Sequence, residues 1–457
     1  MQPNRNHAIG VLRYCTAAIL FTSCAAAQSG TELRGILERL DRLEAQNREL
    51  AAEVEKLKTE LAAAHDDGPA SAPTLSERLA VEETRTAEQA QSKVGASERF
   101  PIRITGMALF NTYLNSANSG GSAFPTAAAS SPASGGATFR QTTLGLEYNG
   151  PATVWGGKVS GALSMDFYGG SGHTLDQIFR LRTATIGVAW KTRSVMAGLD
   201  RSLLSLRDPE SLAQVGVSPL TGAGNLWLWL PQARVEQDFA LGESSGIRVQ
   251  TALVQTNEAN AVYGGPYPSS SLASEYSTAV APGRPGTEGR VEFFSGTDRR
   301  IEIAPAFHHS ISHVAGGSAP SDIFALDWLA RIGKPLEFSG SMFSGTNTAT
   351  LGGLQQGVLV VGPGKAYAIR SAGGWGQLTW HLLPSLWFNF FTGQEDPRNS
   401  QLRAGAIGKN FAYGANVFLR LAPNVLTSFE VYQYRTSYIH GGTLLSNHYD
   451  LGFAYRF

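Results

Sequence analysis

The sequence predicts an all-β transmembrane barrel of about 16 antiparallel strands, preceded by an α-helical coiled coil. Only 16% of the 457 residues are charged, whereas a soluble globular chain is usually about a quarter charged. No run reaches the roughly 18 apolar residues that a membrane-spanning helix needs. From Phe100 onward, apolar and polar residues alternate. These observations leave a large soluble β-protein and a membrane barrel as the two candidates.

The first 27 residues are typical of a secretory signal peptide. Arg5 and Arg13 precede a short apolar stretch, and three small residues ending at Ala27 follow it, which predicts cleavage after Ala27. The alternative is a lipoprotein signal that leaves an acylated Cys24 at the new N-terminus. Both cysteines, Cys15 and Cys24, lie in this segment. We therefore expect the mature chain to contain no disulfide, thiolate metal site or cysteine nucleophile.

Residues 28–65 are predicted to form a coiled coil, and residues 66–99 a linker. A heptad repeat runs through residues 31–64, and Asn47 is its one polar core position, which we expect to fix the register. A single amphipathic helix packed on its own domain is the alternative, but a strict two-position seam favours self-association. The heptad core consists of Leu33, Ile36, Leu40, Leu43, Asn47, Leu50, Val54, Leu57 and Leu61.

Residues 100–457 are assigned to the barrel. The alternation is clearest at the C-terminus, where Tyr449, Leu451 and Phe453 alternate with His448 and Asp450. One side of this strand is therefore apolar and aromatic, and the other is polar. About sixteen such strands are predicted to begin near Arg103, Ala137, Gly157, Ile178, Ser194, Leu226, Gly246, Glu288, Arg299, Asp322, Pro335, Ala372, Ser385, Lys409, Asn424 and Leu445.

The connections between these strands alternate between short and long. Short turns are predicted at 149–151, 191–193, 241–243, 296–298, 333–335, Pro384 and Pro423. Long loops are predicted near 114–136, 168–177, 202–225, 257–287, 314–321, 347–371, 394–408 and 436–444. This order places every short turn at one rim. A soluble sandwich has no reason to keep it, whereas an outer-membrane barrel does.

Three motifs could suggest chemistry, and each has a simpler interpretation. Residues 242–246 match the G-x-S-x-G pattern but fall in a predicted turn between strands, without the strand-to-helix setting of a hydrolase. His308 and His309 must point to opposite faces of a strand, so they cannot bind one metal ion. Residues 362–366 lack the Ser or Thr of a phosphate loop. We found no nucleophile, base and orienting group together, and we expect no catalytic residue, metal or cofactor.

The polar residues on the inward phase predict an aqueous, mixed-charge wall, because an arginine facing hydrocarbon at mid-membrane costs about 2–4 kcal/mol. Arg180 and Arg182 share the phase of apolar neighbours, which requires a β-bulge or a position at the rim. From Phe100 onward the chain has 25 basic and 22 acidic residues, too balanced for a nucleic-acid partner. The inward set includes Asp166, Arg234, Glu236, Asp238, Arg248, Gln250, Arg290, Glu292, Arg300, Glu302, His308, Asp327, Arg331, His381, Asn389, Arg420 and Glu430.

On these strands and loops, residues 100–457 resemble the sixteen-stranded trimeric porins of Gram-negative outer membranes. Tyr455 and Phe457 are similar to the family's C-terminal assembly signal, and the heptad from Leu33 to Leu61 is similar to the periplasmic coiled coil of the DcaP-like porins. The resemblance implies an outer-membrane homotrimer in contact with lipid and inserted by the barrel-assembly machinery. It also implies a channel for small hydrophilic, often anionic, solutes.

The resemblance further implies that the loop at residues 202–225 folds into the lumen. Its Arg207, Asp208 and Glu210 would then face basic residues on the opposite wall. We expect a weak anion preference set by pore-lining charges, namely Arg207, Asp208, Glu210, Arg234, Arg248, Arg290, Arg300, Arg331 and Arg420. A structural envelope tether that uses the coiled coil is the alternative function, and a hydrolase at the rim is a third.

Overall fold

The computed structural model describes residues 101–150, 153–169, 178–256, 281–282, 284–296, 298–314 and 316–457. The predicted signal peptide, coiled coil and linker lie outside these residues. No helix in the described part of the chain is long and apolar enough to cross a bilayer.

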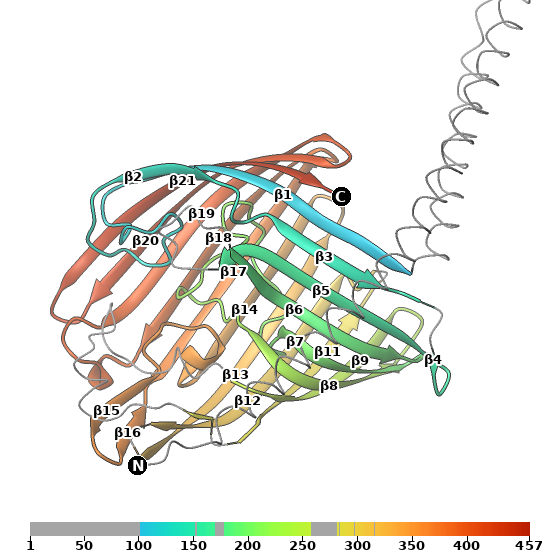
Figure 1. Ribbon diagram of the computed structural model, residues 1–457, viewed down its shortest axis with the longest axis horizontal. Helices are drawn as coiled ribbons and strands as arrows, with labels where there is room; N and C mark the ends of the chain where they lie inside the picture. Colours follow the sequence, from blue (N-terminus) through green and yellow to red (C-terminus); the bar gives the residue numbers. More distant parts are fainter. Residues whose placement is uncertain are drawn as a thin grey trace, which may run out of the picture. The chain divides into compact units, whose positions relative to one another are not determined.

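The described strands form a closed antiparallel barrel with sixteen positions in its wall (Figure 1). Each position pairs with the next along the chain, and β1 pairs with β21 from Met107↔Arg456 to Asn115↔His448, which closes the cylinder. The wall consists of β1 (Ile102–Asn115), β2 (Ser134–Thr138) with β3 (Thr143–Tyr148), β5 (Gly157–Gly169), β6 (Ile178–Ala189), β7 (Arg193–Arg201), β8 (Trp229–Ala240), β9 (Ser245–Val254), β10 (Ala281–Pro282) with β11 (Gly286–Ser295), β12 (Ile301–Val314), β13 (Gly317–Ile332), β14 (Leu336–Thr346), β17 (Arg370–Leu383), β18 (Leu386–Pro397), β19 (Ile407–Ala422), β20 (Val425–Tyr438) and β21 (Gly442–Arg456).

Two positions in the wall are each made of two strands. β2 and β3 pair with successive parts of β1, and β10 and β11 pair with successive parts of β12. Three further short strands stand outside this count in the described residues. β4 (Thr153–Val154) pairs with the start of β5, and β15 (Val358–Gly362) pairs with β16 (Lys365–Ala368).

The predicted strand positions are confirmed, but three of the predicted connections differ. The short turn predicted at 149–151 is longer, because β3 ends at Tyr148 and β5 begins at Gly157, with β4 between them. The predicted loop at 314–321 is wrong, because β12 ends at Val314 and β13 begins at Gly317. The predicted loop at 436–444 is also wrong, because only residues 439–441 separate β20 from β21. In both hairpins the apolar alternation ends before the backbone ladder does. Cross-strand hydrogen bonds therefore extend the strands beyond the apolar band.

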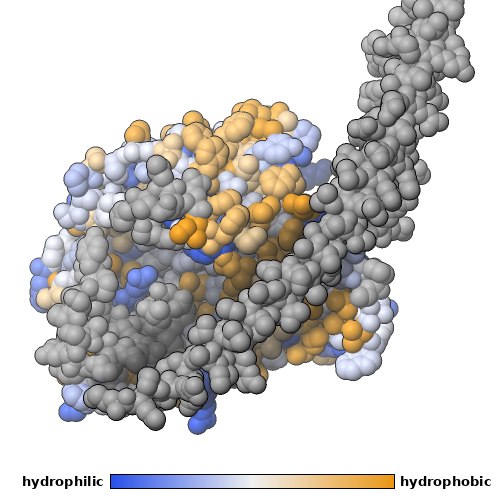
Figure 2. Space-filling model, viewed as in Figure 1, coloured by the Kyte–Doolittle hydropathy of each residue, from blue (hydrophilic) through white to orange (hydrophobic). Residues whose placement is uncertain are grey.

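The two faces of the wall differ as predicted. Leu451 and Phe453 are exposed on the outside, whereas His448 and Asp450 are buried inside. Figure 2 shows hydrophobic side chains gathered over the wall that holds β1 and β3. The alternation confirms that a continuous apolar surface wraps the barrel and that polar groups line its interior.

A β-bulge accounts for Arg182. Ser164 of β5 pairs with Thr183 of β6, but the next residue, Met165, pairs with Leu181. Arg182 is thus the extra residue on β6, and the alternation changes phase there. Of the two explanations that the sequence allowed for Arg180 and Arg182, the bulge is confirmed.

The hairpin of β15 and β16 was not predicted from the sequence. It lies in the connection between β14 and β17, where Val358 and Val360 pack against the inward-facing Val314 and Ala319. The hairpin therefore covers the inner side of β12 and β13 at the rim that carries the long loops, called here the long-loop rim. The opposite rim, with the turns after β6, β8, β13, β17 and β19, is called the short-turn rim.

Candidate functional site

The connection between β7 and β8 turns into the barrel, and we call residues 202–228 the lumen loop. It is much more apolar than a solvated loop, and its leucines are buried except Leu206, which is partly buried. Leu203, Leu204, Leu226 and Leu228 pack in one cluster with inward-facing wall residues such as Ile323. This packing removes apolar surface of both the loop and the wall from water, so it holds the loop inside.

Two more clusters fix the middle of the lumen loop to the other side of the barrel. Leu220 and Ala223 pack in a cluster with Trp375, Phe391 and Tyr432. Leu212 packs in a third cluster, with Leu109, Trp387, Phe418 and Leu426. The lumen loop is thus the packing partner of the inward aromatic residues of β17 to β20. Because its ends pack on the opposite side, the loop crosses the lumen.

Polar contacts fasten the loop at its base. Glu288 of β11 accepts hydrogen bonds from Ser202 Oγ at 2.7 Å and from the Leu203 backbone N–H at 2.8 Å. Its carboxylate also lies 3.0 Å from His308 Nδ1, and His308 Nε2 lies 2.9 Å from Ser310 Oγ. A buried carboxylate that accepts this many hydrogen bonds orders both the loop and the wall.

Ser310, His308 and Glu288 have the connectivity of a nucleophile, base and orienting acid. The sequence-based expectation that no such set exists is therefore wrong for these three residues. All three side chains are buried, with Ser310 only 3% exposed, and Glu288 is engaged by the loop. The contacts of Glu288 with Ser202, Leu203 and His308 assign the set to anchoring the lumen loop.

Further contacts hold the loop on the wall opposite its base. Gln141 Oε1 accepts from the backbone N–H groups of Val215 and Gly216 at 2.7 and 2.8 Å. Its Nε2 donates to the Ala213 carbonyl at 2.7 Å. Ser211 Oγ donates to Glu430 at 2.7 Å. The lumen loop is therefore hydrogen-bonded on both sides of the barrel.

The structure corrects the expected partners of the three charged loop residues. Arg207 pairs with the acidic Glu302 and lies 3.6 Å from Asp327. Asp208 pairs with Arg201 at the end of β7, with 2.8 Å between Arg201 Nη1 and Asp208 Oδ1. The prediction that these residues face basic groups across the pore is wrong for Arg207, because the loop packs on the wall and its charge is neutralised there.

Glu210 has no basic partner among the described residues, and its contacts are neutral donors. Trp387 Nε1 and Asn389 Nδ2 donate to its carboxylate at 2.9 and 3.2 Å. Its backbone carbonyl accepts from Asn416 Nδ2 at 2.8 Å. At the Glu210 carboxylate, an indole and one amide thus take the place of the expected basic residues.

Burial affects the Arg207 guanidinium itself. Removal from water lowers the pKa of Arg207, and the nearby Asp327 carboxylate opposes this effect. Arginine starts from a very high pKa, so the side chain keeps its charge.

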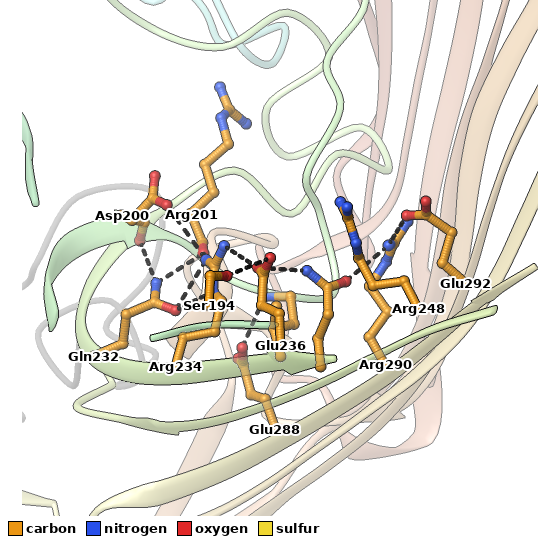
Figure 3. Close-up of polar contacts among 12 residues, drawn as sticks. Ser194, Asp200, Arg201, Gln232, Arg234, Glu236, Arg248, Glu288, Arg290 and Glu292 are labelled. Carbon is orange, nitrogen blue, oxygen red and sulfur yellow. Dashed lines mark hydrogen bonds and ion pairs between the residues drawn. The ribbon is translucent and has the colours of Figure 1, made fainter. Parts of the chain in front are cut away.

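A ladder of alternating charges lies on the wall of β8, β9 and β11 (Figure 3). Arg290 is its most buried member, with its side chain 1% exposed. Arg290 donates to Asp327 through Nε and Nη2 at 2.7–3.1 Å, to Glu292 at 2.5 Å and to Gln250 at 3.0 Å. This guanidinium is fully engaged by protein groups.

The other arginines of the ladder are paired in the same way. Arg234 lies 3.3 Å from Asp200 and 3.5 Å from Glu236. Arg248 donates to Asp238 at 2.6 and 2.9 Å. Arg299 continues the ladder through Glu292 at 2.5 Å and Asp238 at 3.7 Å. Each positive charge is therefore compensated by neighbouring carboxylates, and this wall contributes little net field.

A second cluster, on β6, β7 and the segment before β3, carries an excess of positive charge. Its guanidinium groups belong to Arg140, Arg180, Arg182 and Arg201. Asp166 accepts from Arg180 at 2.5 and 3.1 Å and lies 3.7 Å from Arg182. The second carboxylate of the cluster belongs to Asp208, which pairs with Arg201. Four arginines therefore share two carboxylates. We call these residues the arginine cluster.

Arg140 is one of two members of this cluster, with Arg201, that sequence reasoning did not single out. Its guanidinium donates to the carbonyls of Tyr168 and Gly169 at 3.3 Å each and lies 4.4 Å from the centre of the Tyr168 ring. None of the described carboxylates pairs with it. It lies in residues 139–142, between β2 and β3, where no alternation marks a direction, so the sequence pattern gave no signal.

The remaining predicted pore residues lie at the short-turn rim. Arg331 is 42% exposed and pairs with Glu337 at 2.8 Å. Arg420 is exposed and lies 5.6 Å from the Trp387 ring centre. Arg300 is exposed as well. Neither Arg300 nor Arg420 has an ion-pair partner in the described part of the chain.

A closed sixteen-position barrel whose longest described loop folds into the lumen has the fold of the outer-membrane porins. The outer-membrane channel DcaP of Acinetobacter baumannii has this fold with a TM-score of 0.64 and 15% identity, over 78% of this chain and 97% of that one. The anion-selective porin of Comamonas acidovorans is also similar, with a TM-score of 0.50 and 10% identity over 78% of this chain and 99% of that one.

OprB of Pseudomonas putida gives a similar match, with a TM-score of 0.50 and 10% identity over 79% of this chain and 96% of that one. No protein-family model and no curated protein sequence matches the chain. At these identities the likeness concerns the fold, and function has to be argued from this chain's own residues. Within the described residues, no group of three or more His, Cys, Asp or Glu side chains could hold a metal ion.

Proposed function

We propose that the chain forms a water-filled channel in the outer membrane of a Gram-negative bacterium. Small hydrophilic solutes would cross it by passive diffusion, with a weak preference for anions. The observation that carries this proposal is the division between an apolar outer wall and an inner wall lined by the charge ladder and the arginine cluster. Buried charges in such numbers need a polar lumen.

The charge balance supports a weak preference rather than a strong one. The ladder around Arg290 is compensated at each step, so its field is small. The arginine cluster supplies an excess of positive charge, and Arg300 and Arg420 add positive charges at the short-turn rim that no described carboxylate pairs with. Selectivity among solutes would follow from these charges and from the width that the lumen loop leaves.

The proposal includes assembly. The chain forms a homotrimer, and the coiled coil of residues 28–65 joins the subunits in the periplasm. The insertion machinery recognises the end of β21, where Tyr455 and Phe457 are both 48% exposed on the outer wall. Support comes from the heptad pattern and from the outward position of these two rings.

Planar-bilayer recording tests the channel. Purified protein should give stepwise conductance, and a panel of sugars, dicarboxylates and phosphates should reveal which solutes reduce it. Protein that inserts into the bilayer but gives no conductance steps contradicts the proposal.

The alternative is a structural tether in which the coiled coil anchors the envelope. Deletion of residues 31–64 separates the two functions. Retained conductance with intact barrels supports the channel, whereas loss of envelope integrity with no change in solute uptake supports the tether.

A further inference from the structure

An apolar groove of about 800 Å³ lies on the outer wall and is lined by residues of strands from β4 to β12. Its floor follows the register of the sheet. Val159 lies opposite Val188, Val188 opposite Val195, Val195 opposite Val235, and Val235 opposite Thr251. Residues directly opposite one another point to the same face of the sheet, here the outer one, so these side chains form one continuous row across five strands.

The neighbouring row explains why the wall is hollow here. Ile186 lies opposite Ala197, Ala197 opposite Ala233, and Ala233 opposite Leu253. Two alanines therefore sit between two bulky, exposed side chains, since Ile186 is 62% and Leu253 56% exposed. Small residues in the centre and large ones at the borders give a groove with walls.

The size and lining of the groove define what can occupy it. Its volume lies within the roughly 300–1,000 Å³ typical of small-molecule sites. Apart from Thr251 and Thr287, the outward side chains that line it are apolar. In the channel proposed above, this face borders hydrocarbon, so an occupant must be apolar along the length of the groove.

One end of the groove meets a basic and aromatic edge at the short-turn rim. Trp190 and Arg193 lie two residues beyond Val188 and Val195, on either side of the turn between β6 and β7. The Arg193 guanidinium lies 5.3 Å from the Trp190 ring centre, and Lys191 between them is exposed. No carboxylate among the described residues pairs with Lys191 or Arg193.

The turn between β4 and β5 is hydrogen-bonded to this edge. Trp190 Nε1 donates to the Trp155 carbonyl at 3.1 Å, and the Trp155 side chain is 91% exposed. Tryptophan rings of membrane proteins gather at the level of the lipid headgroups. This edge therefore lies where a headgroup would sit, and no carboxylate in the described ranges neutralises its positive charge.

We propose that the groove and its edge form a binding site for one anionic glycerophospholipid of the periplasmic leaflet. Lys191 and Arg193 hold the phosphate, the Trp190 ring contacts the glycerol region, and one acyl chain lies along the groove between Ile186 and Leu253. The inference rests on the proposed membrane placement, in which the short-turn rim is periplasmic. Charge complementarity selects the headgroup, because moving an acyl chain from the surrounding lipid into the groove gains little free energy.

Native mass spectrometry of the full-length protein in detergent tests the site. Phosphatidylglycerol and phosphatidylcholine are added separately at equal concentrations, and the lipids retained per barrel are counted. We expect one tightly retained phosphatidylglycerol and weaker retention of phosphatidylcholine. Arg193→Ser should weaken phosphatidylglycerol binding roughly fivefold, the effect of one basic side chain near an anionic lipid surface.

The matched control for the charge is Arg435→Ser, an exposed arginine on the outward phase of β20. This control should retain phosphatidylglycerol as the unchanged protein does. Equal retention of phosphatidylcholine and phosphatidylglycerol would overturn the headgroup assignment.

A second variant tests the groove itself. Ala233→Phe fills its centre and should abolish retention, whereas Ala415→Phe on the outward phase of β19 should not. Unchanged retention in Ala233→Phe overturns the site, and so does a loss of oligomer mass without a change in lipid, which would make the groove a subunit interface. Conductance of the same variants keeps the two proposals apart, because a barrel that conducts but retains no lipid contradicts only the lipid site.

Discussion

Arg290 of β11 and Asp327 of β13 form a buried bidentate ion pair across the intervening strand β12. Arg290 Nη2 lies 2.7 Å from Asp327 Oδ2, and the two side chains are 1% and 2% exposed. The pair depends on register, since Ala306 of β12 lies opposite Arg290 and Ala304 of β12 lies opposite Asp327. Two small alanines between them leave the space through which the guanidinium reaches the carboxylate.

Removing this guanidinium should destabilise the barrel strongly. Arg290→Gln removes the bidentate partner of Asp327 and leaves Glu292 with Arg299, and breaking a buried pair from one side costs about 3–5 kcal/mol. Arg331→Gln is the control, because its pair with Glu337 is exposed and such pairs contribute about 0–1 kcal/mol. Thermal unfolding in detergent, followed by the loss of the compact band on unheated gels, measures both. Equal midpoints for the two variants would contradict the buried-pair assignment.

Arg140 is the residue whose removal should alter selectivity with little effect on folding. Its contacts are carbonyls and a ring, so Arg140→Gln leaves no unpaired carboxylate and reduces the excess positive charge of the arginine cluster. We expect the reversal potential under a salt gradient to shift toward cations. Arg435→Gln, which changes an outward-facing charge, should leave it unchanged. The same potential in Arg140→Gln and the unchanged protein would remove the cluster from the selectivity argument.

The barrel could be predicted from the sequence because its wall has two different environments. Apolar outward residues such as Phe453 must alternate with polar inward residues such as Asp450. This period of two is visible in the sequence even when the neighbouring strands are unknown. Strand ends beyond the apolar band could not be predicted, because the ladder there is held by backbone hydrogen bonds. Val314 and Gly317 show this at the unexpectedly short turn.

The candidate site was less predictable, because its contacts depend on register and on the path of a loop. Inward aromatic residues such as Trp375 and Phe391 could have indicated that a segment packs on the inner wall, and the leucines of the lumen loop could have indicated that this loop is the segment. Nothing in the spacing links the two sets. The partner of Arg207 likewise follows from the path of the loop, and it proved to be Glu302 rather than a basic group.

Glu288 should control how firmly the lumen loop is held. Glu288→Ala removes the acceptor for Ser202 Oγ and the Leu203 N–H and leaves that buried N–H unpaired, a cost of about 1–3 kcal/mol. We expect a noisier open-channel current with more frequent closures, because the base of the loop becomes mobile while the leucine clusters keep it inside. Current variance in single-channel records measures this.

Glu243→Ala, in the exposed turn between β8 and β9, is the control for Glu288→Ala and should leave the noise unchanged. A quiet current in Glu288→Ala would show that the leucine clusters alone fix the loop.

Gly224 should not tolerate a side chain, because the lumen loop lies directly against β17 there. Its φ is +101°, and a Cβ would lie 2.1 Å from the Gly374 carbonyl oxygen. Gly224→Ala must therefore displace the loop or the strand. Gly405→Ala isolates this effect, because Gly405 also has a positive φ, +82°, but nothing lies within 4 Å of its Cβ position. Backbone strain of about 1–3 kcal/mol applies to both variants, so any additional loss of thermal stability in Gly224→Ala reports the clash. Limited proteolysis of the unheated barrel should cut the lumen loop faster in Gly224→Ala, and equal cleavage rates in the two variants would contradict the close contact with β17.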